Sequence, residues 1–254
     1  MSMYMITFSP TGGTKKVAEV LADRLFSEYK CIDLTDSSLD FSSYSFTADD
    51  VCLIAAPVFG GRIPEPAAAR LSQMQAYNTR AVLAAVYGNR AFEDALVEMQ
   101  DLAELTGMVP VAGVAAIAEH SIARTIAASR PDDADIRQLQ EFADRIAPRL
   151  REPLPAHRLQ LPGNHPYRDY SKSALVPSVS DICTKCGVCA AHCPTQAISA
   201  DDPTQTDASR CIACMRCISV CPEQARFLPD PVLAAMTAKL SALCPEPKQN
   251  ECFL

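Results

Sequence analysis

Residues 181–198 have the sequence DICTKCGVCAAHCPTQAI, and residues 209–226 have the sequence SRCIACMRCISVCPEQAR. The two segments align with a period of 28 residues, and each contains the pattern C-x2-C-x2-C-x3-C-P. Eight of the twelve cysteines in the 254-residue chain lie in this repeat. The repeat therefore predicts a small domain that is organised around its cysteines.

The spacing of these cysteines favours iron–sulfur clusters over disulfides or zinc. Disulfides are typical of exported proteins, and the start MSMYMITFSPTGG has no basic n-region or cleavage site. Two consecutive x2 spacings followed by x3-C-P are not the usual pattern of a tetrahedral zinc site. Three thiolates spaced three residues apart converge on one cube of iron and sulfide, whereas the fourth points to the neighbouring cube.

By this geometry each of two [4Fe-4S] clusters takes three cysteines from one half of the repeat and one from the other. The predicted ligands are Cys183, Cys186, Cys189 and Cys221 for the first cluster, and Cys211, Cys214, Cys217 and Cys193 for the second. The pattern resembles the bacterial two-cluster ferredoxins over about 48 residues, both prolines included. That resemblance implies a small α+β ferredoxin domain over residues 179–229.

The remaining cysteines give no comparable signal. Cys31 and Cys52 fall in predicted strands, where small core residues are expected, and Cys244 and Cys252 have no partners at metal spacing. For His192, which is next to Cys193, two interpretations are open: its ring makes a hydrogen bond that tunes a cluster, or its side chain is solvated.

The first 150 residues alternate apolar runs with amphipathic segments, which is typical of an α/β fold with a parallel sheet. The expected strands are Tyr4–Phe8, Lys30–Asp33, Val51–Ala56, Ala81–Tyr87 and Val109–Ile117. The expected helices are Thr14–Tyr29, Glu65–Ala76, Ala91–Leu105 and Pro131–Leu150. Together they predict a doubly wound, five-stranded parallel sheet.

Three loops at the carboxyl ends of these strands suggest a ligand site. The first, SPTGGT at residues 9–14, leads straight into a helix and offers donors to a phosphate, or simply caps that helix. It is neither a Walker A loop nor a G-x-G-x-x-G fingerprint. The others are PVFGGR at 57–62 and YGNRAF at 87–92, and open α/β sheets bind ligands where such loops meet.

Together the three loops resemble the phosphate loop and the two ring-flanking loops of flavodoxins. This resemblance spans roughly residues 3–150 and implies bound FMN. For the phosphate it implies Ser9, Thr11, Gly12, Gly13 and Thr14. For the ring it implies Pro57, Val58, Phe59, Gly60, Gly61, Arg62, Tyr87, Gly88, Asn89, Arg90 and Phe92, with Phe59 and Tyr87 as aromatic faces.

Several features leave alternatives open. The chain has no Trp, so the tryptophan often stacked on the ring in flavodoxins is absent, and an empty α/β scaffold is the other interpretation. Arg62 and Arg90 either place positive charge near the ring or face solvent. His120 follows the last predicted strand, and either supplies a proton as a catalytic residue or anchors a loop.

Four segments follow from these patterns: an FMN-binding domain at 1–150, a Pro-rich linker at 151–178, the ferredoxin domain at 179–229, and a helix with a fraying tail at 230–254. Tyr167 and Tyr170 indicate that part of the linker packs on another element. Residues 1–150 have a net charge of −7, and residues 151–254 a net charge of 0. No basic face indicates nucleic acid, and no apolar run is long enough to cross a membrane.

The whole chain resembles the flavodoxin–ferredoxin fusion proteins of anaerobic bacteria and archaea. The resemblance implies a cytoplasmic protein that transfers electrons between its clusters, FMN and a low-potential redox partner protein. One alternative is an FMN-dependent reductase of a small organic acceptor, with a pocket closed by linker residues near Tyr167. The other is a ferredoxin whose acidic first domain docks a partner without any flavin.

Overall fold

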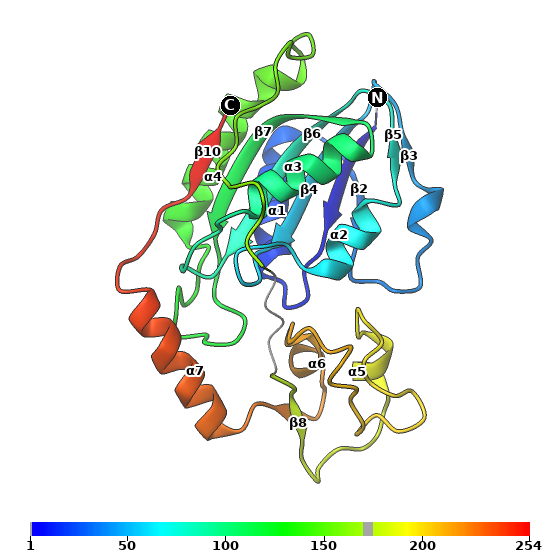
Figure 1. The fold of residues 1–254 in the computed structure, drawn as a ribbon, viewed down its shortest axis with the longest axis vertical. Coiled ribbons are helices and arrows are strands. Elements are labelled where there is room, and N and C mark those ends of the chain that lie inside the picture. Colours follow the sequence, from blue (N-terminus) through cyan, green and yellow to red (C-terminus); the bar gives the residue numbers. More distant parts are fainter. Residues whose placement is uncertain (1, 170–174) are drawn as a thin grey trace.

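A mainly parallel sheet forms the centre of the larger part of the molecule (Figure 1). The computed structural model describes residues 2–169 and 175–254. The strand order is β10-β7-β6-β4-β1-β2, and every neighbouring pair is parallel except β10 and β7. The five parallel strands thus have the order 2-1-3-4-5 in sequence, which is the flavodoxin-like doubly wound order.

The sheet strands are β1 (Met3–Thr7), β2 (Lys30–Asp33), β4 (Val51–Pro57), β6 (Thr79–Tyr87), β7 (Met108–Ile117) and β10 (Glu251–Phe253). The helices around it are α1 (Gly13–Leu25), α2 (Glu65–Leu71), α3 (Ala95–Leu105) and α4 (Asp133–Ile146). Beside them lie the short helices η1 (Phe41–Ser43) and η2 (Ala147–Leu150) and the strand pair β3 (Ser45–Phe46) and β5 (Gln75–Ala76). The predicted helix at 65–76 ends at Leu71, because its last two residues pair with β3 instead.

Both faces of the sheet are covered by helices, which explains the continuous apolar runs of its strands. On one face α1 and α4 bury Val17, Leu21 and Leu139 against the sheet. On the other face α2 and α3 bury Leu71 and Leu96. The loops predicted to bind a ligand therefore extend from a core that is packed on both faces of the sheet.

The C-terminal residues add a sixth strand, which the sequence analysis did not predict. Glu251–Phe253 pair antiparallel with Gly113–Ala115 of β7, so the expectation of a fraying tail is wrong. Asn250 is 4% exposed, accepts a hydrogen bond from Ile117 N at 2.8 Å and donates to Asp135 at 2.8 Å. A three-residue strand has too little periodicity to be detected, and its pairing depends on these tertiary contacts.

The linker packs along α3 where the structure describes it. Asp94, at the start of α3, accepts hydrogen bonds from Asn164 N at 2.9 Å and Arg168 N at 2.8 Å. The Tyr167 hydroxyl donates to Asp101 on the same helix. Tyr170 lies outside the described residues.

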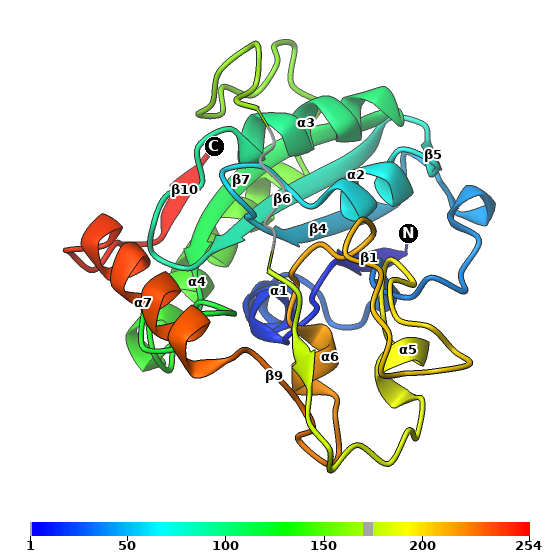
Figure 2. The same ribbon diagram turned by 60° about the horizontal axis from the view of Figure 1, so that its bottom comes forward.

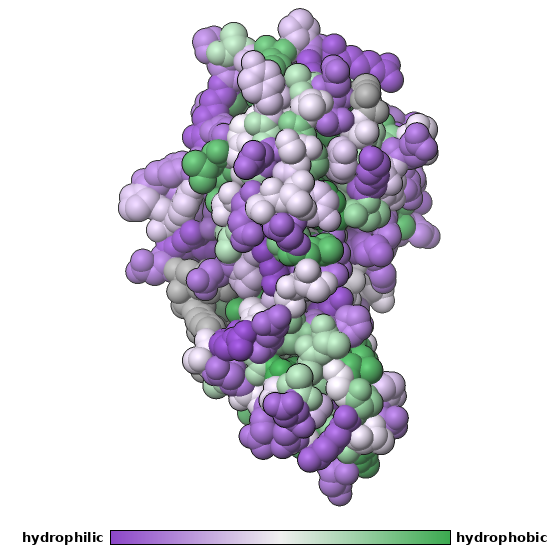
Figure 3. All heavy atoms as spheres, turned by 90° about the vertical axis from the view of Figure 1, so that its right-hand side faces the viewer, coloured by the Kyte–Doolittle hydropathy of each residue, from purple (hydrophilic) through white to green (hydrophobic). Residues whose placement is uncertain are grey.

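The cysteine-containing region lies beyond the carboxyl ends of the parallel strands (Figures 1 and 2). It consists of β8 (Ser178–Val179), α5 (Val188–Ala191), α6 (Arg216–Ser219) and β9 (Arg226–Phe227), with β8 and β9 paired antiparallel. It forms the narrow lower end of the molecule in Figure 3. Helix α7 (Asp230–Leu243) then leads back to β10. No helix in the described part of the chain is long and apolar enough to span a membrane.

Candidate cofactor sites

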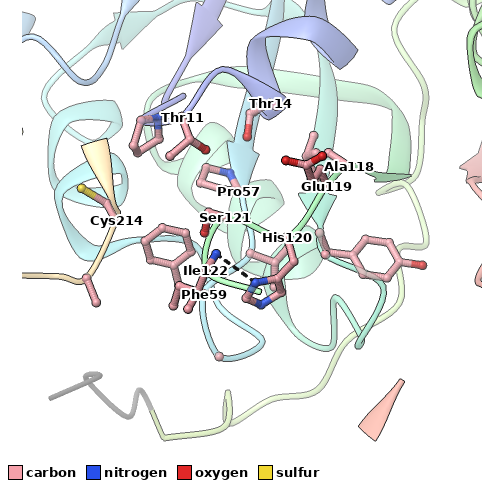
Figure 4. A pocket seen from close by; sticks show the side chains of 18 of the residues that line it. Thr11, Thr14, Pro57, Phe59, Ala118, Glu119, His120, Ser121, Ile122 and Cys214 are labelled. Carbon is pink, nitrogen blue, oxygen red and sulfur yellow. Dashed lines mark hydrogen bonds between the residues drawn. The ribbon is translucent and has the colours of Figure 1, made fainter. Parts of the chain in front are cut away.

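A cavity opens at the carboxyl ends of β1, β4, β6 and β7, where the strand order reverses (Figure 4). The loops after these four strands form most of its wall, and the second cysteine segment completes it. Its lining residues are Pro10, Thr11, Gly13, Thr14, Pro57, Val58, Phe59, Gly60, Val86, Tyr87, Gly88, Ala118, Glu119, His120, Ser121, Ile122, Ile212, Ala213 and Cys214. This is the position at which doubly wound sheets bind ligands.

The loop after β1 is suited to an anion. Ser9 Oγ accepts a hydrogen bond from Lys15 N at 2.9 Å, and Gly12 has a φ of 93°, so the loop turns sharply into α1. The first turn of α1 contains no acidic residue. Thr11 and Thr14 line the cavity (Figure 4), and helix N-termini attract phosphate through free N–H groups and the helix dipole.

On the opposite wall, Phe59 is the aromatic side chain best placed to meet a ring. Its side chain lies between Cys214 and His120 in Figure 4. Tyr87 also lines the cavity, but it is 3% exposed and its ring packs edge-on against Phe92 with centroids 5.4 Å apart. The Tyr87 ring is therefore packed mainly in the core, which leaves Phe59 as the more accessible aromatic face.

Gly88 is required for the close approach of two loops. A Cβ atom at this position would lie 2.6 Å from Cδ2 of His120. Only glycine lets the loop after β6 pack against the His120 ring.

His120 is held as a neutral imidazole. Its Nδ1 accepts hydrogen bonds from Ile122 N and Ala123 N, both at 3.1 Å (Figure 4). An accepting Nδ1 places the proton on Nε2. Burial, and then the charge of Arg90, lower the pKa of His120, which favours the neutral ring with its proton on Nε2.

Two predicted ring contacts, Arg62 and Arg90, are paired away from the cavity. Arg62 donates to both oxygens of Glu98, at 2.7 and 2.8 Å, and lies over the Tyr167 ring. Arg90 donates to both oxygens of Glu93. Neither arginine is among the residues that line the cavity, although the charge of Arg90 lowers the pKa of His120 at the cavity wall. Positive charge near the ring therefore stays a prediction.

Other predicted residues also lie outside the lining set. Asn89 binds the C-terminal tail, since it donates to Glu246 O at 3.0 Å and accepts from Lys248 N at 2.8 Å. Phe92 packs between Tyr87 and Phe253. Ser9, Gly12 and Gly61 belong to the predicted loops but do not line the cavity.

The structure brings the first predicted set of cysteines together. Cys183, Cys186, Cys189 and Cys221 line one small cavity, although Cys221 comes from the other half of the repeat. We call this group the far site. Within residues 2–169 and 175–254, no three His, Cys, Asp or Glu side chains converge on a position for a single metal ion.

The second predicted set, Cys193, Cys211, Cys214 and Cys217, also gathers; we call it the near site. Burial raises the pKa of Cys214 to about 12; a hydrogen bond from the Arg216 backbone opposes this rise, and the proximity of the other three cysteines adds to it. Each half of the repeat repeats one sulfur contact: Ala197 N donates to Cys193 Sγ, and 28 residues later Ala225 N donates to Cys221 Sγ, both at 3.3 Å. Four cysteine sulfurs gathered at one place suit an iron–sulfur cluster, which binds them as thiolates.

The near site adjoins the cavity at the sheet. Ile212, Ala213 and Cys214 form part of its wall. Arg216 Nη1 donates to the carbonyls of Ser9 at 3.4 Å and Pro10 at 3.3 Å, in the loop after β1. Both predicted cofactor regions therefore meet at one place.

The sequence analysis did not predict the contact between the near site and the cavity at the sheet, although the sequence contains a sign of it. Between the cysteines, the first half of the repeat has Thr184 and Lys185, whereas the second has Ile212 and Ala213 at the matching positions. An apolar cysteine loop indicates contact with another domain.

Comparisons with known proteins match two parts of the chain separately. Residues 182–230 match the family model of the 4Fe-4S dicluster domain. No curated protein matches the chain in sequence.

Several solved structures align with the sheet-containing part. A flavodoxin of Streptococcus pneumoniae is 17% identical with a TM-score of 0.43, over 58% of this chain and 99% of its own. Oxidised flavodoxin 1 of Bacillus cereus is 15% identical with a TM-score of 0.40, over 58% and 98%. Rubredoxin oxygen:oxidoreductase of Desulfovibrio gigas is 16% identical with a TM-score of 0.43, over 59% and 36%. By its own strand order and its dicluster match, the chain is a fusion of a flavodoxin-like domain with a 4Fe-4S ferredoxin domain.

Proposed function

We propose that this protein transfers electrons between two [4Fe-4S] clusters, an FMN in the cavity at the end of the sheet, and a low-potential redox partner protein. The observation that carries the proposal is the position of Cys214, which lines the same cavity as Thr11 and Thr14. A predicted cluster ligand is thus part of the wall of the predicted flavin site.

The residues of the cavity fit FMN. Thr11, Thr14 and the N-terminus of α1 supply donors for its phosphate, and Phe59 supplies an aromatic face. FMN, when bound, exchanges one or two electrons, whereas each cluster exchanges one.

The two cysteine groups have different surroundings, which suggests different tasks. Cys186 of the far site is exposed, so a partner protein can approach that cluster. Cys214 of the near site faces the cavity. We propose that electrons pass between the partner and FMN through the far cluster and then the near cluster.

Cofactor content after anaerobic purification tests the proposal. One FMN together with about eight iron and eight sulfide per chain, the count for two four-cysteine clusters, is the expected result. Clusters without flavin, even after FMN is added, would leave a ferredoxin with a docking domain. About four iron would contradict the assignment of two clusters.

A second candidate function is an FMN-dependent reductase of a small organic acceptor, and one observation favours it. His120 lines the cavity, and its Nδ1 is held as an acceptor so that Nε2 carries the ring proton, which can orient an acceptor or be donated to it. Tyr167 does not close this cavity, because it packs on α3. Loss of turnover in His120→Gln, with cluster-to-flavin transfer unchanged, would support the reductase; unchanged turnover of every acceptor tested would support the carrier.

A further inference from the structure

Arg226 is a buried cation without a carboxylate partner. Its side chain is 2% exposed, Nη1 donates to Thr206 Oγ1 at 2.8 Å, and Nη2 donates to the Pro203 carbonyl. Its Nε has no hydrogen-bond partner, and no ion pair of Arg226 exists within the described ranges 2–169 and 175–254. Burying an unpaired charge is costly, so an anionic group is expected beside this guanidinium.

The guanidinium lies at the far site. Arg226 lines the same small cavity as Cys183, Cys186, Cys189 and Cys221. The Pro203 carbonyl that Arg226 binds is also 4.0 Å from Cys189 Sγ. Glu223 also lines this cavity, but within the described residues it forms no ion pair with Arg226. The anion expected beside the guanidinium is therefore the cluster with its four thiolates.

The repeat itself shows that an arginine is not needed to build this part of the fold. The position that matches Arg226 in the first half, 28 residues earlier, is Ile198, which is also buried at 6% exposure. An apolar side chain therefore fills the equivalent place. The two halves of the repeat therefore differ at this buried position, which holds the cation Arg226 in one half and the apolar Ile198 in the other.

We infer that Arg226 is the counter-charge of the far cluster and raises its reduction potential, so that the far cluster is the more easily reduced of the two. This inference rests on the proposed function, because it requires a cluster in each cysteine group. Reduction adds one electron, taken from the redox partner, and makes the cluster more negative by one charge. A buried cation and an N–H donor beside its sulfurs stabilise that reduced form.

Arg226 also lines a second cavity together with Met215 and Ile218, but of the two cavities only that of the far site contains cysteines. Replacing Arg226 should therefore shift the potential of the far cluster more strongly than that of the near cluster.

The test is an anaerobic redox titration followed by EPR of the reduced clusters in the full-length protein. Arg226→Gln and Arg226→Ile remove the charge, and the second copies Ile198. Arg226→Lys keeps the charge but changes its hydrogen bonds. Lys185→Gln is the matched control, because it removes a cation that is next to Cys186 but 62% exposed. Cys186→Ser alters a far-site ligand and so identifies the far cluster's signal.

At the wild-type midpoint of the far cluster, we expect the reduced-to-oxidised ratio to fall at least tenfold in Arg226→Gln and Arg226→Ile. A tenfold change is about 59 mV for a one-electron couple. Arg226→Lys should lie between these variants and the wild type, and Lys185→Gln should change the ratio less than Arg226→Lys does.

Equal shifts of both clusters, or no shift with full iron content, would overturn the inference. Loss of iron in both Arg226→Gln and Arg226→Lys would assign Arg226 to folding and also overturn it. The proposed function fails in a different way, which is seen before any variant is made, if the wild-type protein lacks two clusters.

Discussion

The two halves of the cysteine repeat have the same cysteine pattern but opposite surroundings. The first half of the repeat provides three cysteines of the far site, and we call it the far half; Thr184 and Lys185 lie between its cysteines and are exposed. The second half provides three cysteines of the near site, and we call it the near half; its matching residues Ile212 and Ala213 are buried, and Ile212 belongs to the same apolar cluster as the sheet. The cysteines therefore determine which cofactor each half can bind. The residues between the cysteines determine whether that half faces solvent or packs against the sheet domain.

The strongest test of this comparison removes one cysteine from each half at matching positions. Cys186→Ala and Cys214→Ala should each lose about half of the iron. Because Cys214 lines the flavin cavity, its loss should abolish flavin reduction by a one-electron donor, whereas in Cys186→Ala a small chemical donor should still reach the flavin through the near cluster. Stopped-flow absorbance measures both rates, and equal loss in the two variants would contradict distinct near and far roles.

The comparison also requires that a flavin occupies the cavity beside the near half. Thr14 is buried at the start of α1 and lines the cavity. A hydrogen bond to a charged group contributes about 1.5–3 kcal/mol, so Thr14→Val should weaken FMN binding roughly 10- to 100-fold. Titration of the flavin-free protein with FMN measures this.

The matched control for that titration is Thr184→Val, which changes an exposed threonine in the far half and should leave the affinity unchanged. Iron content should be normal in both variants. If Thr11→Val and Thr14→Val both bind FMN as tightly as the wild type, the flavin is not held by the loop after β1.

A milder change exchanges the character of the two halves. Ile212→Thr places in the near half the residue that the far half has at position 184. Because Ile212 is 6% exposed, loss of buried methyl groups and burial of a hydroxyl should lower the free energy of unfolding by about 2 kcal/mol. Urea unfolding under anaerobic conditions measures it.

The reverse exchange, Thr184→Ile, lies on an exposed loop and should change the free energy of unfolding by less than about 0.5 kcal/mol. Similar effects of the two exchanges would mean that the near half is no more firmly packed than the far half.

The last expected effect concerns His120 and pH. Burial and Arg90 lower its pKa in the folded protein, whereas in the unfolded chain it titrates near 6.5. Below about 6.5 the unfolded state binds a proton that the folded state does not yet bind. The free energy of unfolding should therefore fall as the pH falls below about 6.5, by at most about 1.4 kcal/mol per pH unit.

His120→Gln removes this dependence. The change in the urea midpoint between about pH 7.5 and about pH 5.5 should be smaller in the variant than in the wild type. An identical change in both proteins would show that other groups account for the pH dependence.

Local patterns in the sequence were sufficient for much of the fold. The parallel strands are long apolar runs buried on both faces, and each expected strand has a counterpart in the sheet. The expected grouping of Cys221 with Cys183 also follows from local spacing, because the turn after the third cysteine directs the fourth away.

The remainder depends on contacts between distant segments. Arg62 follows a predicted strand, but its carboxylate partner Glu98 lies 36 residues further along the chain, and no spacing rule identifies it. Strand β10 has three residues and exists because β7 has a free edge. The contact between Cys214 and the cavity joins residues that are far apart in the chain.

The position of β10 imposes an order on the making of the protein. Synthesis proceeds from the N-terminus, so the five parallel strands have all been made once Ile117 has been added, whereas Glu251–Phe253 follow after all eight repeat cysteines. Until β10 joins β7, the linker is the one covalent segment that ties the ferredoxin domain to the sheet. A cluster assembled before this step forms in a domain that is tied to the sheet at its N-terminal end only. A cluster assembled afterwards forms in a domain that is tied to the sheet at both ends.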